Sequence, residues 1–380
     1  MILWITILIA LIILTSAAIL YVSKSVYSIA AEIRSNAGIF FQTGKYSRSW
    51  RGLSILAVLA VFSLLSLCLH IINAVVVFLH LAVFLILSDL IFYIFRRNLP
   101  SGYVKRLSAI AACAATLCAL SAGWYLNHNV WRTEYSLTTS KEIEPLRIVM
   151  FADSHIGTTF NAAGFEKHLK NMEKDRPDLI IIAGDFVDDS TTKDDMLGSV
   201  RALGKIRTKY GIYFAVGNHD KGYYGDLRRG YSLAEMTDEM RRNGITVLTD
   251  EISDLPANIT VIGRKDLSVE RELQGSRYSA AQLRALVPED RYAIVIDHQP
   301  SDFNRLADSR FDLVLGGHTH GGQMFPINSI GKLNGVLDLV YGYERRGTTD
   351  FIVTSGISDW ALKFKTGTFS EYTVININRK

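Results

Sequence analysis

The chain opens with long apolar stretches and turns to the shorter alternation of a globular domain only after residue 140. Residues 1–22 carry no charged side chain, and residues 53–95 carry a single formal charge, Asp89. A helix needs about 20 predominantly apolar residues to cross a bilayer. Polar residues near His70 to Asn73 divide the second stretch into two. We therefore predict four membrane-spanning helices, at about residues 1–22, 53–72, 74–95 and 104–126.

Two features of the apolar part have alternative interpretations. A cleaved signal peptide would begin with basic residues and have a shorter apolar core. Residues 1–22 have neither, which favours a retained first helix over a removed leader. Asp89 lies inside the third predicted span, where a charge is a functional-site candidate by default. It also lies two turns before Arg96 and Arg97, and we favour a structural role in which the carboxylate reaches toward that interface.

The loop charges predict the orientation of the four spans. Cytoplasmic loops of membrane proteins are enriched in Lys and Arg. The loop between the second and third spans has no such residue. The first and third loops hold all nine basic residues of this part, namely Lys24, Arg34, Lys45, Arg48, Arg51, Arg96, Arg97, Lys105 and Arg106. Both termini, and the domain after the fourth span, are therefore expected outside, in the periplasm or the extracellular space.

Charge and cysteine content exclude several kinds of partner and metal site for the C-terminal part. The 380 residues have a formal net charge of +4, but residues 1–140 hold 10 basic against 3 acidic residues and residues 141–380 hold 31 against 34. A slightly acidic domain argues against a nucleic-acid partner. Cys68, Cys113 and Cys118 all lie in the apolar stretches. The domain therefore uses neither a disulfide nor a thiolate metal ligand.

The second half of the chain has the pattern of an α/β domain. The polar segment 127–144 is interpreted as a linker to a domain at residues 145–380. Apolar strand patterns alternate there with helical patterns at about residues 165–175, 194–209 and 232–243, as in layered α/β folds. Five apolar runs end in carboxylate, imidazole or carboxamide groups. The runs are residues 147–151, 179–183, 212–216, 293–296 and 311–315.

Polar groups at the carboxyl ends of strands are where α/β sheets bind ligands. The last of the five groups has the sequence Gly-Gly-His-Thr-His-Gly-Gly, from Gly316 to Gly322. Glycines allow the backbone to turn sharply beside a ligand, and imidazole is a common ligand of zinc and similar ions. The other four groups begin at Asp153, Asp185, Asn218 and Asp297. Together they indicate a metal site built from five strand ends.

These motifs resemble those of calcineurin-like metallophosphoesterases, in particular the membrane-anchored bacterial branch. Asp-x-His, Gly-Asp-x-x-Asp, Gly-Asn-His-Asp, His-x-Pro and Gly-His-x-His occur between Asp153 and His320 in the family's order. The resemblance implies a four-layer αββα sandwich and two divalent ions. Asp185 would bridge the ions. One ion would take Asp153, His155 and His320, and the other Asn218, His298 and His318. The oxygen and nitrogen ligands suit Mn, Fe, Zn or Co and select none of them.

The resemblance also implies the chemistry. A hydroxide shared by the ions would attack the phosphorus, since metal binding lowers the pKa of water. His219 would protonate the leaving oxygen. We expect Asp220 to orient His219, and Asp188 to support the turn at Asp185. A tyrosine-containing run, residues 221–225, is either a pocket wall or an exposed loop. The cations Arg228, Arg229, Arg345 and Arg346 either bind an anionic headgroup or are merely solvated.

Three functions are compatible with the sequence. The first is a phosphoesterase in the bacterial inner membrane that cleaves a phosphomonoester or phosphodiester of a lipid or envelope substrate, so that its partners are the bilayer and that substrate. The second is a pyrophosphatase of the UDP-2,3-diacylglucosamine type in lipid A synthesis, which needs a cytoplasmic domain. The third is a non-catalytic metal-binding scaffold. All seven ligand positions and His219 are filled, which disfavours the scaffold.

Overall fold

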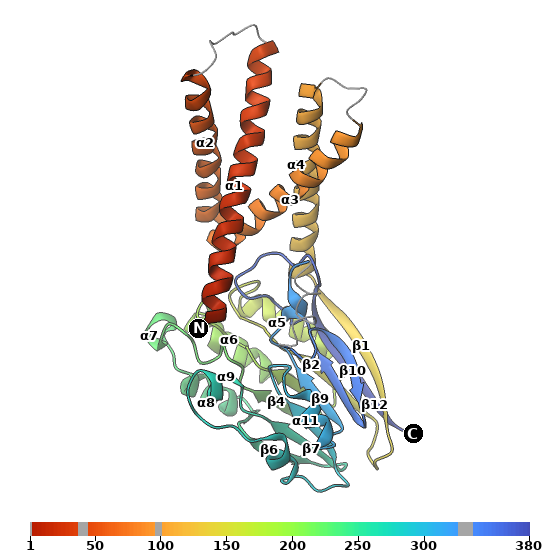
Figure 1. Cartoon of the computed structure of the whole chain (residues 1–380). Coiled ribbons are helices and arrows are strands. Elements are labelled where there is room, and N and C mark those ends of the chain that lie inside the picture. Colours follow the sequence, from red (N-terminus) through yellow and green to blue (C-terminus); the bar gives the residue numbers. More distant parts are fainter. Residues whose placement is uncertain (1, 37–44, 96–100, 326–336) are drawn as a thin grey trace. The chain divides into compact units, whose positions relative to one another are not determined.

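The computed structural model describes residues 2–36, 45–95, 101–325 and 337–380. The chain forms two compact units, Met1–Ala122 and Gly123–Lys380 (Figure 1). The predicted boundary at residue 126 is four residues late because the end of α4 (Ser101–His128) is bonded into the second unit. Ser370 Oγ donates to Asn127 O at 2.8 Å, and the peptide nitrogen of Lys365 donates to Gly123 O at 3.0 Å.

The first unit contains the four predicted apolar helices. They are α1 (Ile2–Asn36), α2 (Lys45–Leu69), α3 (Ile71–Phe95) and α4. Each holds a segment long and apolar enough to cross a membrane, which indicates a membrane protein. The break between α2 and α3 falls at His70, as predicted. α1 continues past residue 22, where the apolar stretch ends. The residues that follow include the good helix formers Lys24, Ala31, Glu32 and Arg34.

Asp89 has a structural role that joins three helices. Its carboxylate accepts hydrogen bonds from Tyr21 OH at 2.8 Å, Ser108 Oγ at 2.6 Å and Lys105 Nζ at 2.8 Å. These partners lie on α1 and α4, while Asp89 lies on α3. The expected partners Arg96 and Arg97 lie outside the described residues. The observed cationic partner is Lys105 of α4.

The second unit contains two six-stranded sheets. The first sheet has the order β1-β12-β2-β3-β4-β5. Its strands are β1 (Val130–Thr139), β12 (Ser370–Arg379), β2 (Leu146–Phe151), β3 (Leu179–Ala183), β4 (Ile212–Ala215) and β5 (Ile245–Leu248). β2 to β5 run parallel, and β12 pairs antiparallel with β2. The carboxyl ends of β2, β3 and β4 therefore meet at one edge of this sheet.

The second sheet brings two more of the predicted strand ends to the site. Its order is β10-β11-β9-β8-β7-β6, with β7, β8, β9 and β11 parallel. Its strands are β10 (Gly342–Arg346), β11 (Thr349–Val353), β9 (Leu313–Gly316), β8 (Tyr292–Ile296), β7 (Ile259–Gly263) and β6 (Glu251–Leu255).

Side-chain alternation along the strands builds the four predicted layers. Ile148 and Met150 of β2 face the core between the two sheets, together with Val261, Ile294 and Leu315 from the second sheet. Val149 and Phe151 point to the opposite face, where helices cover the first sheet. A third cluster buries α10 (Ala280–Arg284) and α11 (Phe303–Asp308) on the second sheet. The αββα sandwich is thus confirmed.

Side-chain caps determine where the helices that cover the first sheet begin. α5 (Ala162–Glu173), α6 (Lys193–Leu203) and α8 (Leu233–Arg242) begin after Asn161, Thr192 and Ser232, whose side chains accept from backbone N–H groups. α6 ends at Leu203, six residues before the predicted position 209. The remaining short helices are α7 (Asp226–Arg229), α9 (Ser268–Arg271) and the 3₁₀ turn η2 (His320–Gly322).

The predicted linker at residues 127–144 is wrong. α4 extends to His128, and β1 then pairs in parallel with β12 from Val130–Ser370 to Thr139–Arg379. The sequence Val-Trp-Arg-Thr-Glu-Tyr-Ser-Leu-Thr-Thr is rich in β-branched and aromatic residues, which favour strands. It is also polar, because β1 is an edge strand with one exposed face. Polarity alone therefore gave the wrong interpretation.

Candidate metal centre

The predicted ligands converge in the structure from both sheets. Asp153 and His155 follow β2, Asp185 follows β3, and Asn218 follows β4. His298 follows β8, while His318 and His320 follow β9. Five of these residues have left-handed backbone with φ between 36° and 71°, namely Asp153, His155, Asp185, His318 and His320. Such a conformation is costly for residues other than glycine and clusters at functional sites.

The ligands form two groups. The ligand atoms of Asp153, His155 and His320 lie within 4.8 Å of one another, and so do those of Asp185, His298 and His318. Five of the six side chains are buried, and His318 is half-buried. The first group is the predicted ligand set of one ion. The second holds the remaining predicted residues except Asn218.

Hydrogen bonds and glycines hold the two groups together. The peptide nitrogen of His318 donates to both carboxylate oxygens of Asp153 at 3.0 Å, which links the loop after β9 to the loop after β2. A Cβ at Gly317 would lie 2.5 Å from Asp153 Oδ2, and one at Gly184 would lie 2.5 Å from His298 Nδ1. The absence of side chains at these two positions is therefore what lets the ligands approach the backbone.

The donor atoms fit divalent cations. Asn218 Nδ2 donates to Tyr223 OH at 3.0 Å, which leaves Asn218 Oδ1 buried without a hydrogen-bond partner. His155 Nε2 is also buried without one. A buried polar atom left unpaired costs about 1–3 kcal/mol. Cations between the two groups would satisfy these atoms, and an oxygen and imidazole set suits divalent transition metals.

Electrostatics inside the centre also favour a cation. Burial raises the pKa of Asp153 to about 6. Burial would raise the pKa of Asp185 too, but the His298 imidazole, with Nε2 3.0 Å from Asp185 Oδ2, lowers it well below its usual range. Burial would lower the pKa of His155, but the carboxylates of Asp188 and Asp185 raise it to about 9. Bound divalent ions would take the place of these protons as counter-charges to the carboxylates.

Three of the ligand imidazoles have an oxygen atom close to their Nδ1 nitrogen. His298 Nδ1 lies 2.7 Å from Ala183 O, His155 Nδ1 lies 3.3 Å from Asp188 Oδ2, and His320 Nδ1 lies 3.4 Å from Asp359 Oδ1. Such contacts fix the tautomer and the orientation of a metal-binding ring. Asp188 thus faces His155, which differs from the predicted support of the Asp185 turn. Sequence reasoning missed Asp359, although it lies shortly after β11.

Asp220 does not orient His219, and this prediction is wrong. Its buried carboxylate accepts from the peptide nitrogens of Asp185 at 3.0 Å, Val187 at 3.0 Å and Gly217 at 2.7 Å. Asp220 therefore braces the loops after β3 and β4 against each other. His219 Nδ1 is buried and has no hydrogen-bond partner in the described part of the chain.

His219 lies beside the ligands but in neither group. Its peptide nitrogen donates to Asp185 Oδ1 at 2.7 Å, so the residue is tied to the centre through its backbone. Its ring centroid lies 5.1 Å from that of His155, and 5.2 Å from those of Tyr223 and Trp360. Both aromatic side chains are 43% exposed. Burial lowers the pKa of His219. The ring therefore stands between the ligands and an aromatic, solvent-accessible face.

The structure decides between the alternatives for the other predicted groups. Tyr223 lies at the centre, while Tyr224 is exposed under Arg228, whose Cζ is 4.8 Å from the ring centroid. Arg229 is buried and donates to Asp220 O at 2.7 Å. Arg346 pairs with Asp338 at 2.9 Å and Glu344 at 2.8 Å, and Arg345 with Asp350 at 3.6 Å. Arg229, Arg345 and Arg346 thus have protein partners.

Comparison with known proteins agrees with this geometry. Residues 146–322 match the model of the calcineurin-like phosphoesterase family. An uncharacterized metallophosphoesterase of Campylobacter jejuni is 30% identical over 238 residues, which are 62% of this chain and 60% of that protein. A Bos taurus transmembrane protein with metallophosphoesterase domain is 26% identical over 247 residues, covering 60% of this chain and 52% of that protein. The matches thus span roughly three-fifths and half of these relatives.

A third relative, an uncharacterized metallophosphoesterase of Bacillus subtilis, is 25% identical over 237 residues, covering 60% of this chain and 82% of that protein. All three names contain the word metallophosphoesterase. The motifs, the fold and the family match converge on the same residues. Residues 146–322, within the second unit, therefore match the calcineurin-like phosphoesterase family.

Proposed function

We propose that the protein hydrolyses a phosphoester with two divalent ions held in the centre just described. The observation that carries this proposal is the pair of ligand groups, which two sheets bring together beside His219. Asp153, His155 and His320 would hold one ion, and His298, His318 and Asn218 the other. Asp185 would be shared, since Asp185 Oδ2 lies 3.0 Å from His298 Nε2 and 3.9 Å from His155 Nε2. Such ions, which Mn, Fe, Zn or Co would supply, polarise the phosphoryl group and activate water.

The chain's own residues would supply positioning and proton transfer. Asp220 keeps Asp185 and the Asn218 loop in register through three backbone hydrogen bonds. Asp188 and Asp359 hold the imidazoles of His155 and His320. We assign His219 the transfer of a proton to the leaving oxygen. It is a titratable ring next to both groups that neither group needs as a ligand.

The aromatic face beside His219 supports a substrate with an apolar or flat part. Tyr223 and Trp360 flank the ring and are partly exposed, so a leaving group that reaches His219 would contact both. We propose a lipid or envelope phosphoester, because the same chain has four helices that fit a bilayer. The transmembrane relative in Bos taurus supports the same combination of helices and domain.

The test uses the full-length protein in detergent. Metal would be removed with a chelator and replaced by Mn, Fe, Zn or Co, and hydrolysis of mono- and diesters, including phospholipids, would be measured for each. We expect activity that depends on added metal and is absent from Asp185→Asn. Tight metal binding without hydrolysis of any ester would support the scaffold function instead. Hydrolysis of soluble esters but not of lipids would remove the lipid substrate from the proposal.

We also propose that the helices span the bacterial inner membrane and that the domain lies outside the cytoplasm. The nine basic residues of the first and third loops support this orientation. Alkaline phosphatase fused through a flexible linker after Lys380 should be active, and a fluorescent protein that matures only in the cytoplasm should be dark. The opposite pattern would reject this orientation and favour a pyrophosphatase of a nucleotide-linked lipid, which is made on the cytoplasmic side.

A further inference from the structure

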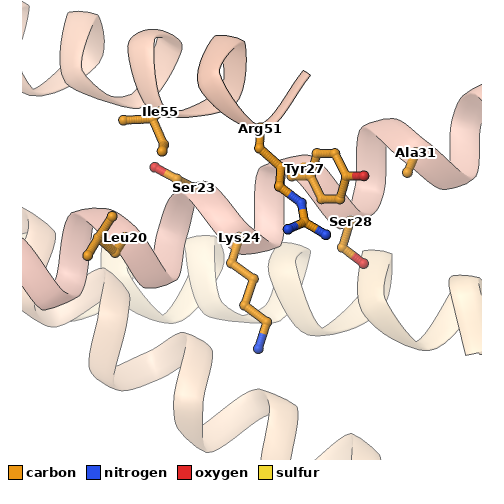
Figure 2. A pocket seen from close by; sticks show the side chains of 8 residues that line it. All are labelled: Leu20, Ser23, Lys24, Tyr27, Ser28, Ala31, Arg51 and Ile55. Carbon is orange, nitrogen blue, oxygen red and sulfur yellow. The ribbon is translucent and has the colours of Figure 1, made fainter. Parts of the chain in front are cut away.

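A cavity of about 490 Å³ lies between α1 and α2, within the first unit (Figure 2). Six of its lining residues come from α1, between Leu20 and Ala31, and two, Arg51 and Ile55, come from α2. The α1 residues recur every three or four positions and so share one face of the helix. Cavities of this size are typical of small-molecule sites.

The lining changes from apolar to polar along the two helices. Leu20 and Ile55 line the apolar part, whereas Lys24, Tyr27 and Arg51 line the polar part. Residues 1–23 and 52–88 carry no formal charge, so Lys24 and Arg51 are the first charges beyond the apolar stretches of their helices. Basic and aromatic residues gather where a helix leaves the hydrocarbon region. In a bilayer spanned by these apolar stretches, the cavity would lie at the headgroup level.

Among the residues that the structure describes, the two cations in the cavity have no carboxylate partner. Residues 1–126 contain only two acidic residues, Glu32 and Asp89. Glu32 pairs with Arg106 at 2.7 Å, and Asp89 pairs with Lys105 at 2.8 Å. The described residues therefore offer no ion pair to Lys24 or Arg51. The Arg51 guanidinium lies 5.3 Å from the centroid of the Tyr27 ring, which positions it across the cavity.

We propose that this cavity binds the headgroup of an anionic phospholipid. The lipid phosphate would contact the Lys24 ammonium and the Arg51 guanidinium, with the Ser28 hydroxyl as a further donor. An acyl chain would follow Leu20 and Ile55 into the apolar region. The site is separate from the metal centre, and it rests on the proposed membrane placement but not on phosphoesterase activity. The unpaired positive charge and the change in polarity together define the ligand class.

The test measures lipid bound to the full-length protein. Wild-type protein purified in detergent would be analysed by native mass spectrometry and by lipid mass spectrometry, and titrated with phosphatidylglycerol and phosphatidylcholine. We expect selective binding of phosphatidylglycerol. The double variant Lys24→Gln/Arg51→Gln should bind it roughly thirtyfold more weakly, about fivefold for each basic residue removed. Arg48→Gln is the matched control, since it removes an exposed cation from the same end of α2 without touching the cavity.

Several results would overturn the site. They are equal binding by wild type and double variant, an equal loss in Arg48→Gln, or no preference for the anionic lipid. Competition by glycerol 3-phosphate as strong as by the lipid would assign the cavity to a soluble phosphate instead. Lys24→Arg/Arg51→Lys keeps both charges and should still bind the lipid. If the neutral variant misfolds, this variant tests the lipid site in its place. Release of the wild-type protein from membranes by carbonate would reject the membrane placement itself.

Discussion

His219→Ala should separate proton transfer from metal binding. The side chain belongs to neither ligand group, and its backbone bond to Asp185 survives the substitution. The variant is therefore expected to keep its metal content. It loses the one ring that stands between the ligands and the exposed aromatic face formed by Tyr223 and Trp360. Only the step that needs a proton at the leaving oxygen should suffer.

The size of the loss depends on the leaving group. A positioned general acid contributes about 10²–10⁴-fold, which is roughly 2.7–5.4 kcal/mol of activation free energy. An alkyl phosphoester needs that proton and should lose about this much. A nitrophenyl ester releases a stable anion without protonation, so its loss should stay below about tenfold and reflect only lost packing. The ratio of the two rates should therefore change by roughly tenfold or more.

The pH dependence follows from the same residue. Burial lowers the pKa of His219 below its usual value of about 6.5, and a general acid acts in its protonated form. Wild-type kcat/KM for the alkyl ester should therefore fall as pH rises through this lowered pKa, and His219→Ala should lack that fall. Rates would be measured with both esters between about pH 5 and 9. His168→Ala, outside the centre on α5, is the control. Equal losses for both esters would refute the general-acid role, and loss of metal would make His219 a ligand.

Three further changes test the centre and its frame. Asp185→Asn should lose most bound metal and nearly all activity, because it removes the charge both ions share; elemental analysis checks this, and an unchanged metal content would contradict it. Asp359→Asn should weaken metal binding about 10–100-fold by removing the carboxylate charge 3.4 Å from His320 Nδ1, which keeps its contact with Ser358 O. Excess metal should restore activity, and a loss that it does not restore would argue against a positioning role. A fragment of residues 141–380 lacks β1 and should unfold at lower temperature than 123–380; equal melting temperatures would show that β1 adds no stability.

Local sequence patterns predicted much of the fold. The apolar runs before Asp153 and Asp185 are strands because they are long enough, rich in β-branched residues and followed by polar groups. Residues 232–243 were predicted to form a helix, and Ser232 caps the observed helix, because its side chain accepts from the Glu235 peptide nitrogen. The candidate ligands could be predicted because the motifs place them directly after strands. All of these inferences depend on neighbours within a few positions.

Contacts between distant residues account for the errors. β1 is a strand because it pairs with β12, more than 200 residues later, and its own composition is polar. Asp359 approaches His320 through a loop whose path no local pattern determines. Asp220 adjoins His219 in sequence, yet its carboxylate turns to three peptide nitrogens. Adjacency along the chain therefore says little about which groups face each other in a turn.

The position of β12 has a consequence for the order of folding. β12 lies between β1 and β2, although it follows every other strand of this sheet in the chain. Both β1 and β2 must therefore wait with an unpaired edge while the intervening residues are synthesised. Unpaired edges invite association with other chains, and late long-range pairing slows folding. We therefore expect the nascent domain to associate with other chains most readily before residues 370–379 are available to pair with β1 and β2.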